Sequence, residues 1–249
     1  EKSLFVFKMI DYLKKSIDTY ANKSETSENT LQTHQEYFKN EKLKHFISRE
    51  KILSAISDYI QNDNNQAFIL YGKSGLGKSS VIAKAIDETI FKRGKEKVIY
   101  RFVGSSSDLS SSTELLISIL AEFGIKEEVR KIDEYKSEPI EDFYCRVYNH
   151  IDNLKDEYIV FIDAVDQLSN EDQFLWLPKS LPFNIKIIIS TLDDKNFKED
   201  SKYFQHLQNR SSLIYELEPF NSAKVLLTNL LKAEDRKISP EQMNYFLLK

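Results

Sequence analysis

The 249-residue sequence predicts an α/β fold in which five mainly parallel strands form a sheet that lies between helices. Short apolar segments of strand length alternate with longer segments whose apolar residues recur at helical spacing. The short segments are apolar throughout, which is typical of strands buried on both faces of a sheet. In addition, half of the six glycines lie within residues 72–77, directly after the first of these strands.

The overall composition excludes several classes of protein. Hydrophobic residues make up 41% and charged residues 30% of the chain, and the formal net charge is −4, which argues against a dedicated nucleic-acid binder. No apolar segment approaches the roughly 20 residues that span a bilayer, and no signal peptide opens the sequence. The single cysteine, Cys145, excludes an internal disulfide and a Cys-based zinc cluster. We therefore expect a cytoplasmic protein without a membrane partner.

Three regions are expected along the chain. Residues 1–45 predict a polar, helical connector with a non-helical break at residues 22–30, and residues 46–218 predict the α/β core. Residues 219–249 are all-helical in pattern, with helices at 223–231 and 240–248, and are interpreted as the beginning of a helical lid. The sequence starts at Glu1 and stops within a helical pattern, so we expect a piece of a longer protein.

The elements of the core follow from apolar periodicity. A first helix is expected from about Ser48, and later helices at residues 79–91, 113–123 and 141–154, the last with apolar residues at i, i+4 and i+7 spacing. The serine-rich loop at residues 104–112 is expected to cap the helix that follows it. The expected strands cover residues 68–71, 98–103, 157–163, 185–190 and 213–217.

The glycine-rich window, GKSGLGKS, has the spacing G-x-x-x-x-G-K-[ST] of a phosphate-binding loop. Gly72, Gly77, Lys78 and Ser79 occupy its four fixed positions, between a predicted strand and a predicted helix as the motif requires. Glycines let backbone N–H groups approach a phosphate without obstruction by a Cβ atom. Lys78 then reaches the β- and γ-phosphates, and the Ser79 hydroxyl is a ligand for Mg²⁺. The expected ligands are ATP or ADP with Mg²⁺.

Carboxylates follow a neighbouring strand. Asp163 ends the buried segment at residues 157–163 and is expected to bind Mg²⁺, while Asp166 polarises the attacking water. Ser190 and Thr191 end the fourth strand, where ligands of open α/β sheets bind, and are either sensors of the γ-phosphate or ordinary strand-end hydroxyls. No [NT]-K-x-D motif for guanine occurs, which favours adenine.

These segments together resemble the signal-transduction NTPases with numerous domains (STAND), and within them the NACHT-like branch. From about residue 31 onwards, HFISRE (45–50), YRFVGSSS (100–107), FIDAVDQL (161–168), WLPKSLPFNIKIIIST (176–191) and LEPFNSAKVLLTNLL (217–231) are similar to that family in the expected order. The resemblance implies that Ile47 packs on adenine. It also implies flanking effector and sensor domains, and assembly of the ATP-bound modules.

The candidate site follows from the motif and the resemblance together. Gln167 stands where many relatives carry glutamate, and no arginine follows Thr191, which implies slow hydrolysis. The predicted catalytic residues are Lys78, Asp163, Asp166 and Gln167, and the predicted metal ligands are Ser79 and Asp163. The predicted nucleotide contacts are Gly72, Ser74, Gly75, Leu76, Gly77, Lys78, Ser79, Ser80, Ile47, Arg49, Ser190, Thr191 and Pro219.

We therefore expect an ATP-binding, slowly hydrolysing switch module that controls nucleotide-dependent oligomerisation in defence or stress signalling. This chain alone is expected to stay monomeric, with self-association in a longer protein. One alternative is an initiator-type AAA+ ATPase that remodels DNA, which the acidic charge balance and the missing arginine argue against. Another is a nucleotide-bound scaffold without turnover.

Overall fold

The structure is a computed structural model that describes residues 27–44, 46–105, 109–125, 139–169, 174–193, 203–220, 224, 227–228, 231 and 235–247. Its strands are β1 (Phe68–Gly72), β2 (Val98–Phe102), β3 (Tyr158–Asp163), β4 (Ile185–Leu192) and β5 (Ile214–Glu216). They form one sheet in the order β2-β3-β4-β1-β5, and every pair of neighbours is parallel. The predicted α/β class and five-stranded sheet are confirmed, and this strand order is typical of P-loop NTPases.

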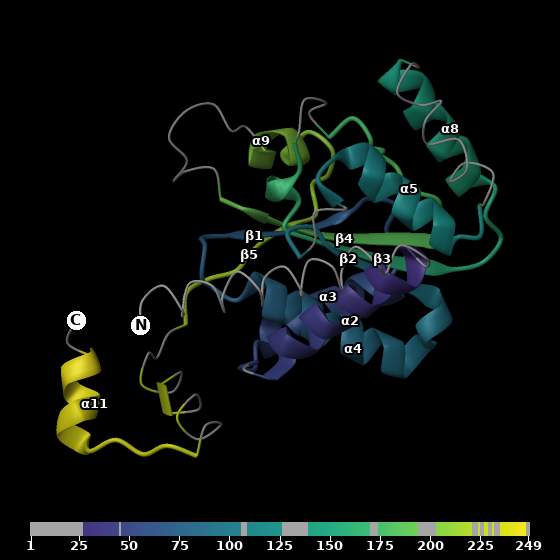
Figure 1. Cartoon of the computed structure of the whole chain (residues 1–249). Helices are drawn as coiled ribbons and strands as arrows, with labels where there is room; N and C mark the ends of the chain where they lie inside the picture. The colour runs from purple at the N-terminus through teal and green to yellow at the C-terminus, as the bar shows by residue number, and fades with distance from the viewer. Residues whose placement is uncertain are drawn as a thin grey trace, which may run out of the picture.

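Helices cover both faces of the sheet (Figure 1). On one face lie α2 (Ser27–Lys44), α3 (Glu50–Gln61) and α4 (Lys78–Arg93), and on the other lie α5 (Ser112–Glu122), α8 (Ile140–Asp152) and α9 (Tyr203–Gln208). Two short 3₁₀ helices, η1 (Lys95–Lys97) and η3 (Val165–Gln167), precede β2 and follow β3. The last described helix is α11 (Pro240–Leu247). None of the helices in the described ranges is long and apolar enough to cross a membrane.

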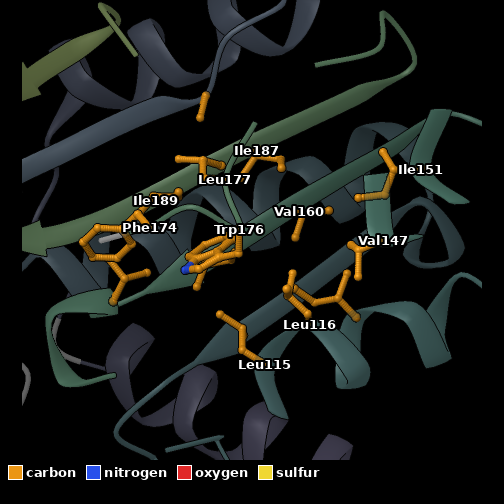
Figure 2. Packing of buried hydrophobic residues seen from close by; sticks show 14 of the residues in the cluster. Leu115, Leu116, Val147, Ile151, Val160, Phe174, Trp176, Leu177, Ile187 and Ile189 are labelled. Atoms are coloured by element: carbon orange, nitrogen blue, oxygen red, sulfur yellow. The ribbon is translucent and has the colours of Figure 1, made fainter. Parts of the chain in front are cut away.

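The strands are buried on both faces because their side chains alternate between two apolar clusters. Ile187 and Ile189 of β4 pack into the cluster under α5 and α8, whereas Ile188 packs into the cluster under α3 and α4. Figure 2 shows the first cluster, in which Leu115 of α5 and Val147 of α8 face the sheet. This two-sided burial explains why the strand segments read as continuous apolar runs.

The N-terminal part of the structure differs from the sequence-based expectation. Residues 27–30 were expected to lie in a break, but they form the first turn of α2. The polar composition that suggests a break is outweighed because α2 packs along α4 and β2, and tertiary packing supplies most helical stability in proteins. The expected helix at residues 223–231 falls largely outside the described residues, while α11 matches the one expected at 240–248.

Helix α2 also covers the free edge of β2. The buried Gln35 side chain accepts a hydrogen bond from the Phe102 backbone N–H (2.6 Å) and donates one to Ser105 Oγ (3.0 Å). The Phe38 ring lies 4.9 Å from the Phe102 ring. A backbone group that no further strand pairs is thereby satisfied by a helix. Residues 27–44 therefore contact the core directly, and the proposed division into three domains stays a prediction.

Candidate functional site

The predicted phosphate-binding loop connects the end of β1 to the start of α4. Gly75 and Gly77 have φ angles of 79° and 90°, which are left-handed values that favour glycine, and Gly77 is the N-cap of α4. The Lys78 side chain is buried, and its Nζ donates hydrogen bonds to the carbonyls of Gly72 (2.7 Å) and Lys73 (2.9 Å). The loop therefore holds a lysine ammonium beside open backbone at a helix N-terminus, where anions bind.

Asp163 lies beside this loop in a hydrogen-bonded cluster. Its carboxylate, 2% exposed, accepts hydrogen bonds from the hydroxyls of Ser190 and Ser79, and Ser190 Oγ accepts one from the Ala164 N–H (3.0 Å). Burial raises the pKa of Asp163, while the two hydroxyls and the positive charges of Lys78 and Lys42 act in the opposite direction. The two predicted metal ligands, Ser79 and Asp163, are thus brought close together.

Asp166 is oriented by a sharp turn after β3. Ala164 has a left-handed φ of 59°, and the following η3 turns Asp166 back so that its Oδ1 accepts a hydrogen bond from the Leu192 N–H (2.9 Å). Burial raises the pKa of Asp166, which makes its carboxylate a stronger base than an exposed aspartate. The Lys78 charge opposes that rise, so Asp166 belongs to the same electrostatic cluster.

A third carboxylate near Lys78 was not among the predicted site residues. Asp193 is 6% exposed, and its backbone N–H donates to the Gly72 carbonyl (3.3 Å). Burial lowers the pKa of Lys78, and the charges of Asp166, Asp163 and Asp193 raise it. In the sequence, Asp193 stood out only as a departure from the arginine of the related family, which gave no signal that its carboxylate lies near the loop.

A cleft of about 260 Å³ adjoins the phosphate-binding loop. Four of the predicted nucleotide contacts outside the glycines, Ile47, Arg49, Leu76 and Ser80, line it together. Phe46, Val81 and Phe220 also line it, although they were not predicted as site residues. The cleft has apolar walls next to the loop, as expected for a site that holds a flat, apolar ring beside bound phosphates.

Arg49 ties three segments of this site together. Its guanidinium donates hydrogen bonds to the carbonyls of Leu76 (3.0 Å) and Glu218 (2.9 Å), and it lies 3.9 Å from the centroid of the Phe220 ring. Partial burial lowers the pKa of Arg49. The segment before α3, the phosphate-binding loop and the chain after β5 are therefore held by one side chain.

Other predicted residues lie outside this cluster. Pro219 lines a neighbouring cavity of about 620 Å³ rather than the smaller cleft, and Ser74 is exposed on the loop. The Gln167 amide packs against Gly104, where an added Cβ would lie 1.7 Å from Oε1. Thr191 is fully buried, its Oγ1 has no hydrogen-bond partner among the described residues, and strand alternation places it on the face of β4 opposite to Ser190.

The donor set fits Mg²⁺ better than a metal that needs a complete protein cage. A hydroxyl and a carboxylate are hard oxygen ligands, and Mg²⁺ in nucleotide sites takes one or two protein ligands with phosphates and water. Within the described part of the chain, no group of three or more His, Cys, Asp or Glu residues is placed to hold a metal ion. Ser79 and Asp163 could therefore hold Mg²⁺ jointly with a nucleotide.

The sequence is similar to several known proteins. Residues 43–191 match the family described as Nephrocystin 3, N-terminal. A TPR repeat-containing protein of Dictyostelium discoideum is 24% identical over 221 residues, which cover 72% of this chain and 13% of that protein. Mouse NACHT domain- and WD repeat-containing protein 1 is 22% identical over 215 residues, which cover 81% of this chain and 14% of that protein. The chain thus spans only a small part of the length of these relatives.

Two solved structures were also compared. AMPPCP-bound DnaA from Aquifex aeolicus has a TM-score of 0.46 at 17% identity, covering 82% of this chain and 58% of that one. The Aeropyrum pernix Orc1 protein in complex with DNA has a TM-score of 0.48 at 14% identity, covering 77% and 50%. From the family match over most of the core, the chain belongs to the Nephrocystin 3, N-terminal family and is a NACHT-type P-loop NTPase module.

Proposed function

We propose that this module binds ATP and ADP with Mg²⁺. The observation that carries the proposal is the placement of the Ser79 hydroxyl, where it stabilises the charged Asp163 carboxylate, next to the buried Lys78 ammonium. A hydroxyl, a carboxylate and an ammonium in this arrangement fit a metal-bound di- or triphosphate. The backbone N–H groups around Gly75 and Gly77 add donors at the N-terminus of α4.

The adjoining cleft supports adenine as the base. Ile47 and Phe220 are apolar and line the cleft together with the backbone of Gly75 and Gly77, so a purine ring can pack there while its phosphates lie on the loop. The sequence holds no [NT]-K-x-D motif that would read guanine. Adenine is therefore favoured over guanine.

We further propose slow hydrolysis with Asp166 as the residue that orients the attacking water. Ala164 directly follows Asp163 and has no group that could act as a base, whereas Asp166 is held in place by the Leu192 N–H. Ser79 and Asp163 would hold Mg²⁺, which when bound neutralises charge on the phosphates. Gln167 lies against Gly104, so its assistance to Asp166 depends on a reorientation of its side chain.

At the level of the whole protein, we propose a cytoplasmic signalling switch that self-associates when ATP is bound, in defence or stress responses. Two observations support this proposal: the resemblance to NACHT-like switch modules, and relatives whose names combine a NACHT domain with WD repeats. Repeat domains commonly present extended binding surfaces, which suits a sensor attached to a nucleotide switch.

Isothermal titration calorimetry with ATP, ADP and GTP, each with Mg²⁺ and again with EDTA, tests nucleotide binding, and phosphate release tests turnover. We expect binding of both adenine nucleotides, a weaker response to GTP, and loss of ATP affinity in EDTA. Binding without phosphate release would indicate a scaffold rather than an ATPase. Absence of binding to any of the three nucleotides would overturn the proposal.

A further inference from the structure

The charges around the phosphate-binding loop are not balanced by Lys78 alone. The charges of Asp163, Asp166 and Asp193 all act on the Lys78 ammonium. A bound nucleotide adds several negative charges to the same place. A triphosphate adds more negative charge than a diphosphate, because it carries one further phosphate group. No arginine directly follows Thr191 at the end of β4, so positive charge beyond that of Lys78 and the proposed Mg²⁺ has to come from another part of the chain.

Lys42, in the last turn of α2, is placed to supply this additional positive charge. Its Nζ lies 4.7 Å from the centroid of the Phe38 ring, and the Phe38 ring lies 4.9 Å from that of Phe102. Phe102 is the register partner of Asp163 in the β2–β3 pair. The end of α2 therefore lies near the carboxyl end of β2, one strand away from Asp163, and Figure 1 shows α2 running alongside α4, which begins at the loop.

The chain after Lys42 leads directly into the nucleotide cleft. The Phe46 N–H donates to the Leu43 carbonyl (3.1 Å), which closes a turn after α2, and Phe46 and Ile47 line the cleft beside Ser80. Lys42 is thus four residues before Phe46 of the cleft, and its helix packs on the end of β2, the strand next to the one that carries Asp163. A lysine side chain with four methylene groups has the reach to act between these points.

No carboxylate among the described residues competes for the Lys42 ammonium. The neighbouring Lys39 and Lys44 pair with Glu36 and Glu41, whereas no described carboxylate lies within salt-bridge distance of Lys42. Its positive charge interacts with the Asp163 carboxylate, as that of Lys78 does. An ammonium without a close carboxylate partner can form a charge-assisted hydrogen bond, so that of Lys42 is available to a bound phosphate.

We propose that Lys42 binds the terminal phosphate of a bound nucleoside triphosphate and so distinguishes ATP from ADP. This inference rests on the proposed nucleotide site and adds a residue from outside the P-loop core to it. In this arrangement, α2 carries a γ-phosphate contact, and its packing along α4 and β2 sets the position of that contact. The competing interpretation is that Lys42 only packs over Phe38 and stabilises the end of α2.

The test is calorimetric titration of the 249-residue chain with Mg²⁺–ATP and Mg²⁺–ADP in four forms: the parent, Lys42→Met, Lys42→Arg and Lys44→Met. Methionine keeps an apolar stem over Phe38 and removes the charge. We expect Lys42→Met to weaken ATP binding about tenfold, the loss typical of one charged phosphate contact, and to change ADP binding less than about twofold. Lys42→Arg should retain most of the ATP preference. Lys44→Met, an equal change of charge two residues away, should alter neither affinity.

Thermal unfolding is the control for folding: if Lys42→Met unfolds at the same temperature as the parent, α2 is intact. An unchanged ratio of ATP to ADP affinity in Lys42→Met would overturn the inference while leaving the proposed site in place. Equal weakening of both nucleotides would also overturn it, since that result indicates a purely structural role. If the parent binds neither nucleotide, the proposed function fails, and this inference fails with it.

Discussion

The hydroxyl of Ser190 donates a hydrogen bond to the carboxylate of Asp163, although 27 residues separate the two in the sequence. The contact arises because β3 and β4 are neighbours in the sheet and both side chains face α4. Ser190 Oγ also accepts the Ala164 N–H, so one hydroxyl satisfies both the end of β3 and its carboxylate. Ser190 therefore orients the candidate metal ligand, whether or not it also responds to a γ-phosphate.

Replacing Ser190 and Thr191 separately should give opposite results. Ser190→Ala removes a donor from the buried Asp163 carboxylate and an acceptor from the Ala164 N–H, so we expect a loss of about 1–3 kcal/mol of unfolding free energy. Thr191→Val removes a buried hydroxyl that has no partner in the described part of the chain, and it keeps the side-chain shape. It should be neutral or stabilising. Urea denaturation measures both, and equal destabilisation by the two changes would contradict the arrangement.

Asp163→Asn should stabilise the nucleotide-free protein at pH 7. Burial raises the pKa of Asp163 above its unfolded value, so the folded state binds a proton more readily than the unfolded state between the two pKa values. The carboxylate therefore destabilises the fold most above its folded pKa, and this cost disappears as the pH falls towards the unfolded value. Asparagine is uncharged at every pH. The gain in unfolding free energy from Asp163→Asn should therefore be present at pH 7 and shrink near pH 4.

Thermal unfolding without Mg²⁺ at pH 7 and pH 4 tests the stability predicted for Asp163→Asn. A change of 1 kcal/mol in unfolding free energy shifts the unfolding temperature by about 2–4 °C for a domain of this size. Asp58→Asn, an exposed change on α3, is the matched control and should show no such trend. The same Asp163→Asn variant should lose the thermal shift caused by Mg²⁺–ATP. A variant that is less stable than the parent at pH 7 would show that the hydrogen bonds to the charged form outweigh its burial.

Lys78→Ala should remove most of the affinity for ATP. The ammonium is the cation at the centre of the loop, and without it the repulsion between three nearby carboxylates and the phosphates would increase. Lys73→Ala is the control, because Lys73 is an exposed lysine of the same loop. Calorimetry should show at least about a tenfold loss for Lys78→Ala, the size of one strong charged contact, and little change for Lys73→Ala. Undiminished binding in Lys78→Ala would mean that the phosphates lie elsewhere.

Asp166→Asn should retain nucleotide binding and lose hydrolysis. Asparagine keeps an acceptor for the Leu192 N–H, so the turn after β3 should persist, but it cannot take a proton from water. Removal of a general base typically slows a reaction about 100- to 10,000-fold, which a phosphate-release assay can resolve if the parent rate is first established. Release at the parent rate, with binding unchanged, would assign the role of Asp166 to another residue.

The parts of the site that sequence could predict are local or follow from strand order. Gly72 to Ser79 is one continuous motif, and Asp163 could be placed beside it because parallel strands end at the same edge of the sheet. Asp193 and Phe220 could not be found this way. Each reaches the site only through the path of the chain after β4 or β5, and neither belongs to a spaced motif. The hydrogen bond between Gln35 and the edge of β2 could not be predicted either. Nothing in the local sequence distinguishes a glutamine that contacts a strand edge from one that faces water.

Arg49→Lys should loosen the nucleotide site although it conserves charge. The guanidinium contacts the Leu76 and Glu218 carbonyls with two different nitrogens while lying over Phe220. A lysine ammonium is a compact point charge that cannot bridge both carbonyls and stack on the ring at once. We expect faster hydrogen exchange in residues 72–80 and 217–220, together with weaker binding of both ATP and ADP. Arg93→Lys, at the exposed end of α4, should change neither property. Exchange that rises in only one of the two segments would show that Arg49 does not couple them, because loss of a shared bridge must release both ends.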